Sequence, residues 1–194
     1  MSDNPIADSA VSKRLPVIVM GVSGSGKSTL GEALARALEL PFIEGDSLHD
    51  AHNIAKMRSG HPLNDADRAG WLDTIASELQ DEQRFPLGLV LTCSALRRTY
   101  RDRLRGATRG LRFLFLRIDV SAAHERLQHR PHHFMPASLV PSQFATLEPP
   151  APEETDIVTL DASAAPATVL ARALQALRPE APTPSPDPSS ARRG

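Results

Sequence analysis

Short apolar runs alternate along the chain with stretches in which apolar residues recur about one helical turn apart. The apolar runs predict β-strands at residues 16–20, 41–46, 88–94, 112–119 and 156–161. The stretches with helical spacing predict helices at residues 27–39, 50–59, 65–83, 96–105, 121–129, 138–147 and 166–177. Strands that alternate with helices predict a three-layer α/β/α domain, in which helices cover both faces of a five-stranded parallel sheet.

The two ends of the chain lack this alternation. Residues 1–14 are polar and show no apolar periodicity, and residues 179–194 are rich in proline and serine. We therefore expect a flexible N-terminal tail at 1–14 and a disordered tail at 179–194. The 194-residue length fits one folded domain between them, at residues 15–178.

The first predicted strand leads directly into a glycine-rich segment, Gly21–Ser28, which fits G-x-x-x-x-G-K-[ST] at every fixed position. A predicted helix follows at once, which is the context that a phosphate-binding loop requires. Lys27 can reach the β- and γ-phosphates of a nucleoside triphosphate, and the Ser28 hydroxyl can ligate Mg²⁺. The expected contacts are Gly21, Val22, Ser23, Gly24, Ser25, Gly26, Lys27, Ser28 and Thr29.

Two carboxylates, Glu44 and Asp46, end the second predicted strand. Because they are two residues apart, their side chains point the same way if the strand continues through them. The carboxyl ends of parallel strands lie at one sheet edge, which brings Asp46, Ser94 and the phosphate loop together. We predict that Asp46 orients an acceptor hydroxyl and takes its proton, and that Glu44 binds Mg²⁺ through water. The alternative is a strand-end turn with two solvated acids.

The stretch 46–71 is rich in polar side chains suited to a small polyhydroxylated or anionic acceptor. They are Asp46, His49, Asn53, Lys56, Arg58, His61, Asn64, Asp67 and Arg68. A solvated helical hairpin is the alternative. Five arginines in the region 97–105 favour a solvated helix face. Arg97, nearest the strand end, is a candidate substrate contact.

Arg126 and Arg130 are four residues apart, immediately before the proline-bracketed segment 131–136. Arginines at such a place can close over a triphosphate and stabilise charge in the transition state. His132 and His133 have no Cys, Asp or Glu at ligand spacing beside them, so the sequence disfavours a zinc site there.

Charge and cysteine content narrow the class of protein. The formal net charge is −1, so no global field draws the chain to nucleic acid or to a membrane. The single cysteine, Cys93, ends an apolar strand, which favours a buried thiol and a reducing compartment. No apolar run reaches the roughly 18 residues of a membrane span. We expect a cytoplasmic protein with a small-molecule substrate and neither a nucleic-acid nor a membrane partner.

Several segments, found in a fixed order, carry a resemblance to a known family. They are Met20–Ser28; Gly45-Asp46 with Leu48-His49, Asn53, Lys56-Met57 and Gly60; Pro62–Asp65 with Asp67-Arg68 and Trp71-Leu72; Cys93–Leu96 with Tyr100–Asp102; Arg126-Leu127 with Arg130 and His133–Met135; and Ser142–Phe144 with Leu147-Glu148. The sequence resembles the gluconokinases of the small P-loop type, relatives of the shikimate and adenylate kinases. The resemblance covers most of the chain between the two tails.

The resemblance implies a P-loop NTPase fold like that of nucleoside-monophosphate kinases, with an acceptor-binding insertion near 47–83 and a lid near 130–141. It implies ATP-dependent phosphorylation of D-gluconate at its 6-hydroxyl in gluconate catabolism, with Mg²⁺ as cofactor and often a homodimer. The implied catalytic residues are Lys27, Asp46, Arg126 and Arg130. The implied substrate contacts are Asp46, His49, Lys56, Arg58, Arg68, Ser94, Arg97 and His133.

Two positions depart from the family pattern: Gly70 stands where proline is frequent, and Arg97 stands where lysine is frequent. Neither touches the phosphate loop or Asp46. A P-loop kinase of another small acceptor, such as shikimate or a nucleotide, remains the alternative, followed by a nucleotide-binding switch without kinase activity. The chain lacks the Asn-Lys-x-Asp segment that guanine-reading switches usually carry.

Overall fold

The computed structural model describes residues 14–128 and 137–178. Within them, five strands form one sheet in the order β2-β3-β1-β4-β5, and every neighbouring pair is parallel. The strands are β1 (Leu15–Met20), β2 (Phe42–Ile43), β3 (Gly88–Cys93), β4 (Arg112–Arg117) and β5 (Ile157–Asp161). The predicted five-stranded parallel α/β architecture is confirmed, and β1, which leads into the phosphate loop, lies at the centre of the sheet.

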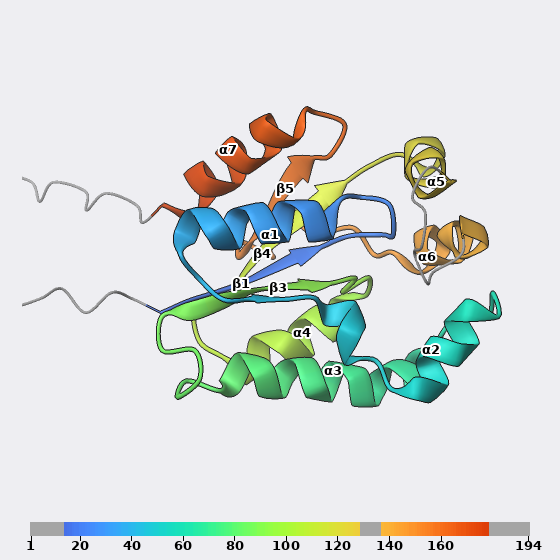
Figure 1. Ribbon diagram of the computed structural model, residues 1–194, viewed down its shortest axis with the longest axis horizontal. Helices are drawn as coiled ribbons and strands as arrows, with labels where there is room; N and C mark the ends of the chain where they lie inside the picture. The colour runs from blue at the N-terminus through green and yellow to red at the C-terminus, as the bar shows by residue number, and fades with distance from the viewer. Residues whose placement is uncertain (1–13, 129–136, 179–194) are drawn as a thin grey trace, which may run out of the picture.

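Helices cover both faces of the sheet (Figure 1). Helices α1 (Lys27–Leu38) and α7 (Pro166–Leu177) lie on one face, and α3 (Asp65–Gln80) and α4 (Arg98–Ala107) lie on the other. Alternation along β1 supplies both cores: Val17 and Val19 pack with α1 and α7, whereas Ile18 and Met20 pack with α3 and α4. This is why the central strands are apolar on both faces.

The remaining helices gather beyond the carboxyl ends of the strands, to the right in Figure 1. They are α2 (Ala51–Arg58), α5 (Val120–Gln128) and α6 (Val140–Thr146), with two short 3₁₀ segments, η1 (Gly45–Leu48) and η2 (Ala137–Leu139). Ligands bind at this edge of an open parallel sheet. The 3₁₀ segment η1 places Asp46 there.

The predicted second strand was wrong beyond Ile43, because η1 replaces its last two residues. Side chains from other elements take both backbone groups of Gly45: its N–H donates to Thr92 Oγ1 (3.0 Å), and its carbonyl accepts from Trp71 Nε1 (2.7 Å). Neither group is then free for the sheet. The strand-alternation argument for Glu44 and Asp46 therefore does not apply.

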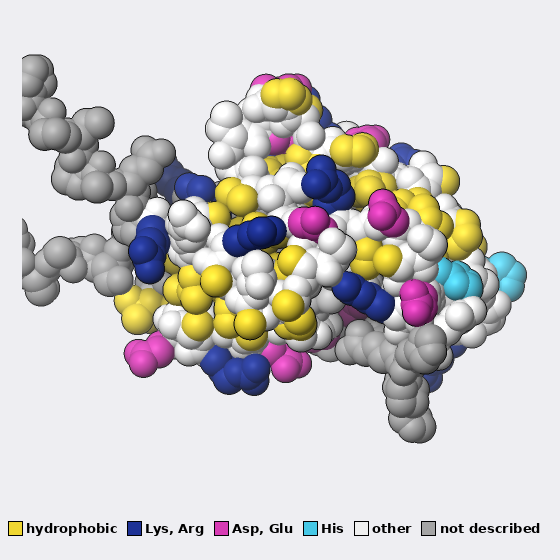
Figure 2. Space-filling view, turned by 90° about the horizontal axis from the view of Figure 1, so that it is seen from above, with side chains coloured by type: hydrophobic (Ala, Val, Ile, Leu, Met, Phe, Trp, Pro, Cys, Tyr) yellow, Lys and Arg dark blue, Asp and Glu magenta, His cyan; other side chains and the backbone are white. Residues whose placement is uncertain are grey.

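The predicted tails and most of the predicted lid lie outside the described residues. Within the described ranges, no helix is long and apolar enough to cross a membrane. The face seen in Figure 2 carries acidic, basic and hydrophobic side chains interspersed rather than one continuous basic patch. That mixture gives no support to a nucleic-acid surface on this face.

Candidate active site

The phosphate loop connects β1 to the N-terminus of α1. Gly26, immediately before α1, has φ 96°, and no side chain caps the helix start. The first amides of α1 are therefore available to an anion, and the helix dipole favours negative charge there. Gly24 has φ 81°, and a Cβ built on it would lie 2.4 Å from the Ala123 carbonyl oxygen of α5. The loop can pack this closely on α5 because position 24 is glycine.

Two contacts fix side chains beside the loop. The Lys27 ammonium is buried and donates to the Val22 carbonyl at 3.1 Å. On the other side, the Ser23 N–H donates to Oε1 of Gln143, a buried residue of α6, at 2.7 Å. No role for Gln143 could be predicted from local sequence, because its partner is 120 residues away in the chain.

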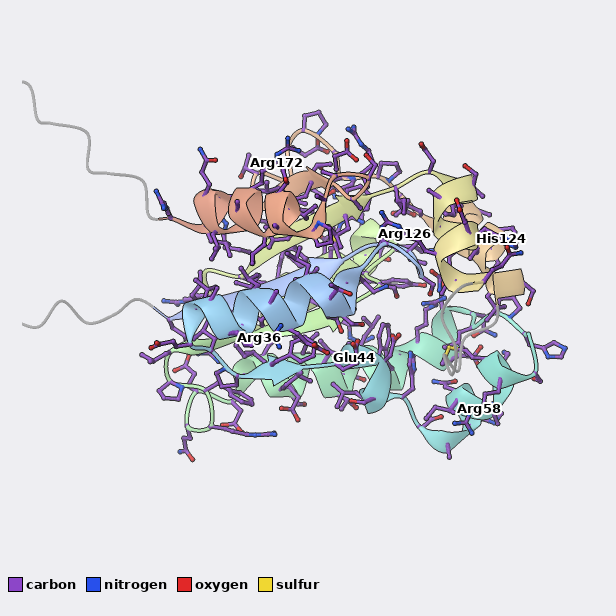
Figure 3. The ribbon with its side chains drawn as sticks, turned by 45° about the horizontal axis from the view of Figure 1, so that its top comes forward. Arg36, Glu44, Arg58, His124, Arg126 and Arg172 are labelled. Carbon is purple, nitrogen blue, oxygen red and sulfur yellow. The ribbon has the colours of Figure 1, made fainter. Side chains whose placement is uncertain are left out.

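A large cavity of about 510 Å³ opens beside the phosphate loop. Its walls come from the loop, α1, β4, α5, the connection between β5 and α7, and the first turns of α7. The residues that line it are Gly24, Ser25, Gly26, Thr29, Leu30, Ala33, Leu116, Arg126, Leu127, Ala162, Ala164, Pro166, Ala167, Val169 and Leu170. Arg126 reaches from α5 to donate to the Ala162 carbonyl at 2.7 Å (Figure 3). A mostly apolar cavity next to a phosphate site suits the nucleoside part of a triphosphate.

A small pocket lies on the other side of the loop. It is lined by Ser23, Lys27, Asp46, His49, Met57, Pro62, Leu63, Arg68, Ser94, Leu139, Ser142 and Gln143. The structure thus brings four predicted acceptor-side residues, Asp46, His49, Arg68 and Ser94, into one pocket with the phosphate-loop lysine, Lys27. The pocket volume of about 20 Å³ leaves room for about one water molecule.

Arg68 is a second buried cation of this pocket, beside Lys27. It is 7% exposed, and within the described residues no carboxylate lies within ion-pair distance and its Nε has no hydrogen-bond partner. Its guanidinium lies 6.0 Å from the centre of the Tyr100 ring, and burial lowers its pKa from the usual value. A buried cation without a counter-ion is costly unless an anion joins it. The geometry therefore suits an anionic group on the acceptor.

His49 supplies a neutral imidazole to the same pocket. Its ring stacks on Trp71 of α3, with the two ring centres 4.2 Å apart and the planes 14° apart. Burial, with the positive charge of Arg68, lowers the pKa of His49 to about 4. Nδ1 of His49 is buried and has no hydrogen-bond partner among the described residues. A neutral imidazole of this kind can exchange a hydrogen bond with an acceptor hydroxyl.

Comparison with known proteins identifies the family of this chain. A family model described as an AAA domain matches residues 17–150. A gluconokinase of Gluconobacter oxydans (strain 621H) is 49% identical over 138 residues, covering 71% of this chain and 78% of that protein. The chain belongs to the gluconokinase family.

Solved structures of similar chains share the fold. A crystal structure of a gluconokinase from Sinorhizobium meliloti 1021 is 46% identical, with a TM-score of 0.75 over 83% of this chain and 90% of that one. An unliganded sugar kinase from Janibacter sp. HTCC2649 is 43% identical, with a TM-score of 0.79 over 84% of this chain and 94% of that one. The predicted resemblance to the gluconokinase family is confirmed.

Several residues expected from the gluconokinase resemblance lie outside the small pocket. Lys56 pairs with Asp67 at 2.6 Å, and Arg97 pairs with Asp65 at 2.7 Å. Arg58 is exposed on α2. Their substrate roles gain no support from this geometry, since the first two cations already have carboxylate partners. Arg130 and His133 lie outside the described residues.

Glu44 is held by Thr92, whose hydroxyl donates to Oε1 of Glu44 and accepts from the Gly45 N–H. Glu44, labelled in Figure 3, lies between β2 and η1. Glu44 does not line the small pocket. Within the described part of the chain, no three His, Cys, Asp or Glu side chains form a metal-binding group. Any Mg²⁺ here would depend on phosphate oxygens and water, as is usual for this ion.

The sequence predicted that the arginines of α4 face solvent, and the structure agrees for only some of them. Arg101 is 1% exposed and pairs with Glu154, so that prediction was wrong for Arg101. Exposed Arg98 and Arg103 do face solvent, paired with Glu153 and Asp73. Cys93 is fully buried, and burial raises the pKa of its thiol to about 12, which fits an inert apolar residue.

Proposed function

We propose that this protein transfers the γ-phosphoryl group of ATP to D-gluconate, giving 6-phospho-D-gluconate and ADP in gluconate catabolism. Membership of the gluconokinase family supports the reaction. The observation that carries the proposal for this chain is Arg68, a buried cation without an ion-pair partner among the described residues, in one pocket with Asp46 and Lys27. A sugar acid has the two groups that this pocket suits, a carboxylate and a hydroxyl.

ATP enters on the donor side of the phosphate loop. Its base and ribose occupy the large cavity, and its phosphates meet the loop amides, the first turn of α1 and Lys27. Mg²⁺ arrives as part of the MgATP substrate. The Ser28 hydroxyl would be its protein ligand, and Glu44 would act on it through water.

Gluconate enters on the acceptor side. Arg68 binds its carboxylate and His49 exchanges a hydrogen bond with a chain hydroxyl, which presents the 6-hydroxyl to Asp46. Asp46 orients that hydroxyl and accepts its proton as the oxygen attacks the γ-phosphorus. Lys27 stabilises the negative charge on the phosphoryl oxygens. Gluconate bound in the pocket takes the place of water, a smaller competing nucleophile, next to the phosphoryl group.

Other parts of the family pattern stay predictions for this chain. Arg126 borders the large cavity, which is compatible with a cation closing over the triphosphate, together with Arg130. A homodimer is expected from the resemblance. A cytoplasmic location is expected because the chain has a single cysteine, Cys93, which is buried.

The test is ADP release from MgATP with and without D-gluconate, followed by NMR identification of the phosphorylated carbon. We expect ADP release to depend on gluconate and the phosphate to appear on carbon 6. A panel with shikimate and nucleoside monophosphates separates the alternatives. Faster turnover with one of those acceptors, or ADP release that ignores every acceptor, would contradict the proposal.

A further inference from the structure

Trp71, on the inner side of α3, contacts Gly45, the residue before Asp46, and His49, which lines the small pocket. It is 2% exposed and is the single tryptophan of the chain. The edge of its indole ring donates a hydrogen bond from Nε1 to the Gly45 carbonyl at 2.7 Å. The face of the same ring stacks on His49 at 4.2 Å.

The first contact fixes the backbone immediately before Asp46. Gly45 is buried and held from two sides, by Trp71 at its carbonyl and by Thr92 Oγ1 at its N–H. A Cβ on residue 45 would lie 1.8 Å from the Thr92 carbonyl oxygen, so the backbone sits against β3 with no room to shift inward. Because Asp46 is the next residue, the direction of its side chain follows from the position of this peptide.

The second contact fixes the imidazole of His49. Stacking on a flat, buried indole restricts the tilt and rotation of the imidazole ring, which leaves Nδ1 in a set direction. Arg68 lies on the same helix as Trp71, three residues earlier, and shares that face of α3. The rigid Trp71 side chain thus contacts both the backbone next to Asp46 and the ring of His49.

We propose that Trp71 is a positioning residue for phosphoryl transfer, which sets Asp46 through Gly45 and sets His49 by stacking. This inference rests on the proposed gluconate kinase activity. Trp71 itself does not line the small pocket, so it acts through these two neighbours rather than on the substrate. Binding of a sugar acid against His49 must then change the surroundings of the indole.

The first experiment replaces the indole edge and keeps an aromatic ring. Trp71→Phe removes the Nε1 donor, and we expect kcat with gluconate to fall by about tenfold to a hundredfold through misplacement of Asp46. The KM for ATP should stay within about twofold of the wild-type value, because Trp71 does not line the large cavity assigned to ATP. Leu79→Ala, on the same helix and in the same core, is the control for lost packing. It should lower the unfolding midpoint and leave kcat within about twofold.

The second experiment needs no variant and covers the case in which Trp71→Phe does not fold. Because Trp71 is the sole tryptophan, intrinsic emission reads its surroundings directly. We expect a saturable change in emission as gluconate is added to the wild-type protein with a non-hydrolysable ATP analogue. The half-saturating concentration should match the KM for gluconate.

The outcomes separate this inference from the proposed function. Wild-type protein without gluconate-dependent ADP release would overturn the proposed function. An active wild-type protein with a Trp71→Phe variant of equal kcat, or with emission that saturating gluconate does not change, would overturn the role of Trp71 alone.

Discussion

Arg101 and Glu154 form a doubly hydrogen-bonded ion pair in the interior of the protein. Nε of Arg101 lies 2.8 Å from Oε1 of Glu154, and Nη2 lies 2.6 Å from Oε2. The side chains are 1% and 2% exposed. Arg101 also donates to the Glu148 carbonyl at 3.1 Å, so the pair fastens the segment after α6 to α4. That segment follows the helix that brings Gln143 to the phosphate loop.

Removal of one partner should be strongly destabilising. Arg101→Met leaves the Glu154 carboxylate buried with Arg105 as its remaining cation, at 2.8 Å. We expect the free energy of unfolding to fall by about 3 kcal/mol, as for other broken buried pairs. Urea unfolding measures this. Arg98→Ala, which removes an exposed pair with Glu153, should leave the midpoint nearly unchanged. Equal midpoints for the two variants would contradict the prediction.

Arg68→Met tests the buried cation. The variant should raise the KM for gluconate by about a hundredfold, because a charge-assisted pair with the carboxylate is lost. It should also raise the free energy of unfolding by about 1 kcal/mol, since a desolvated charge is replaced by an apolar side chain. Steady-state kinetics and urea unfolding give the two values. The control is Arg36→Met, at an exposed position of α1. A destabilised variant with unchanged KM would show that Arg68 serves packing instead.

Asp46→Asn tests the proton acceptor. An amide cannot take the proton of the 6-hydroxyl, so we expect kcat to fall by about a hundredfold or more. Binding of ATP should change little, because the phosphate loop is intact. A coupled ADP assay and nucleotide titration separate the two effects, and Asp73→Asn, on the outer side of α3, is the control. Near-normal turnover would remove Asp46 from the role of base.

His49 predicts a pH dependence of stability. Burial lowers its pKa in the folded protein to about 4, from 6.5 for the free group. As pH falls below 6.5, the unfolded chain therefore binds a proton before the folded protein does. The contribution of neutral His49 to the free energy of unfolding is complete above pH 6.5 and is lost as the pH falls towards 4. The loss amounts to about 3 kcal/mol at most.

Urea unfolding at several pH values between 4 and 7 measures that loss. His49→Phe keeps an aromatic ring on Trp71 but cannot titrate, so its stability should vary less across this range. Glu154 does not confuse the result, because Arg101 lowers the pKa of its carboxyl to about 2 and it titrates at lower pH. Parallel curves for wild type and variant would contradict the assignment.

Local patterns were enough to predict the strand and helix on either side of the phosphate loop. The strand, loop and helix around Gly21–Ser28 depend on neighbours in sequence, and the helix at residues 166–177 was predicted with its observed bounds. The early end of β2 could not be predicted, because Trp71 and Thr92 lie 26 and 47 residues from Gly45. The burial of Arg101 likewise depends on Glu154, 53 residues away. Ion pairs between residues far apart in the chain depend on the tertiary structure, so composition does not show which cations already have a carboxylate partner.

The sheet order has a consequence for how such enzymes can change. The phosphate-loop strand β1 is central, with the large cavity on the β4–β5 side and much of the small pocket on the β2–β3 side. Asp46, His49 and Arg68 come from one contiguous stretch of chain, encoded together. Exchange of that stretch between homologous genes would transfer the three proposed acceptor contacts together and leave the phosphate loop unchanged. Ser94, Ser142 and Gln143, which also line the small pocket, would stay with the recipient gene.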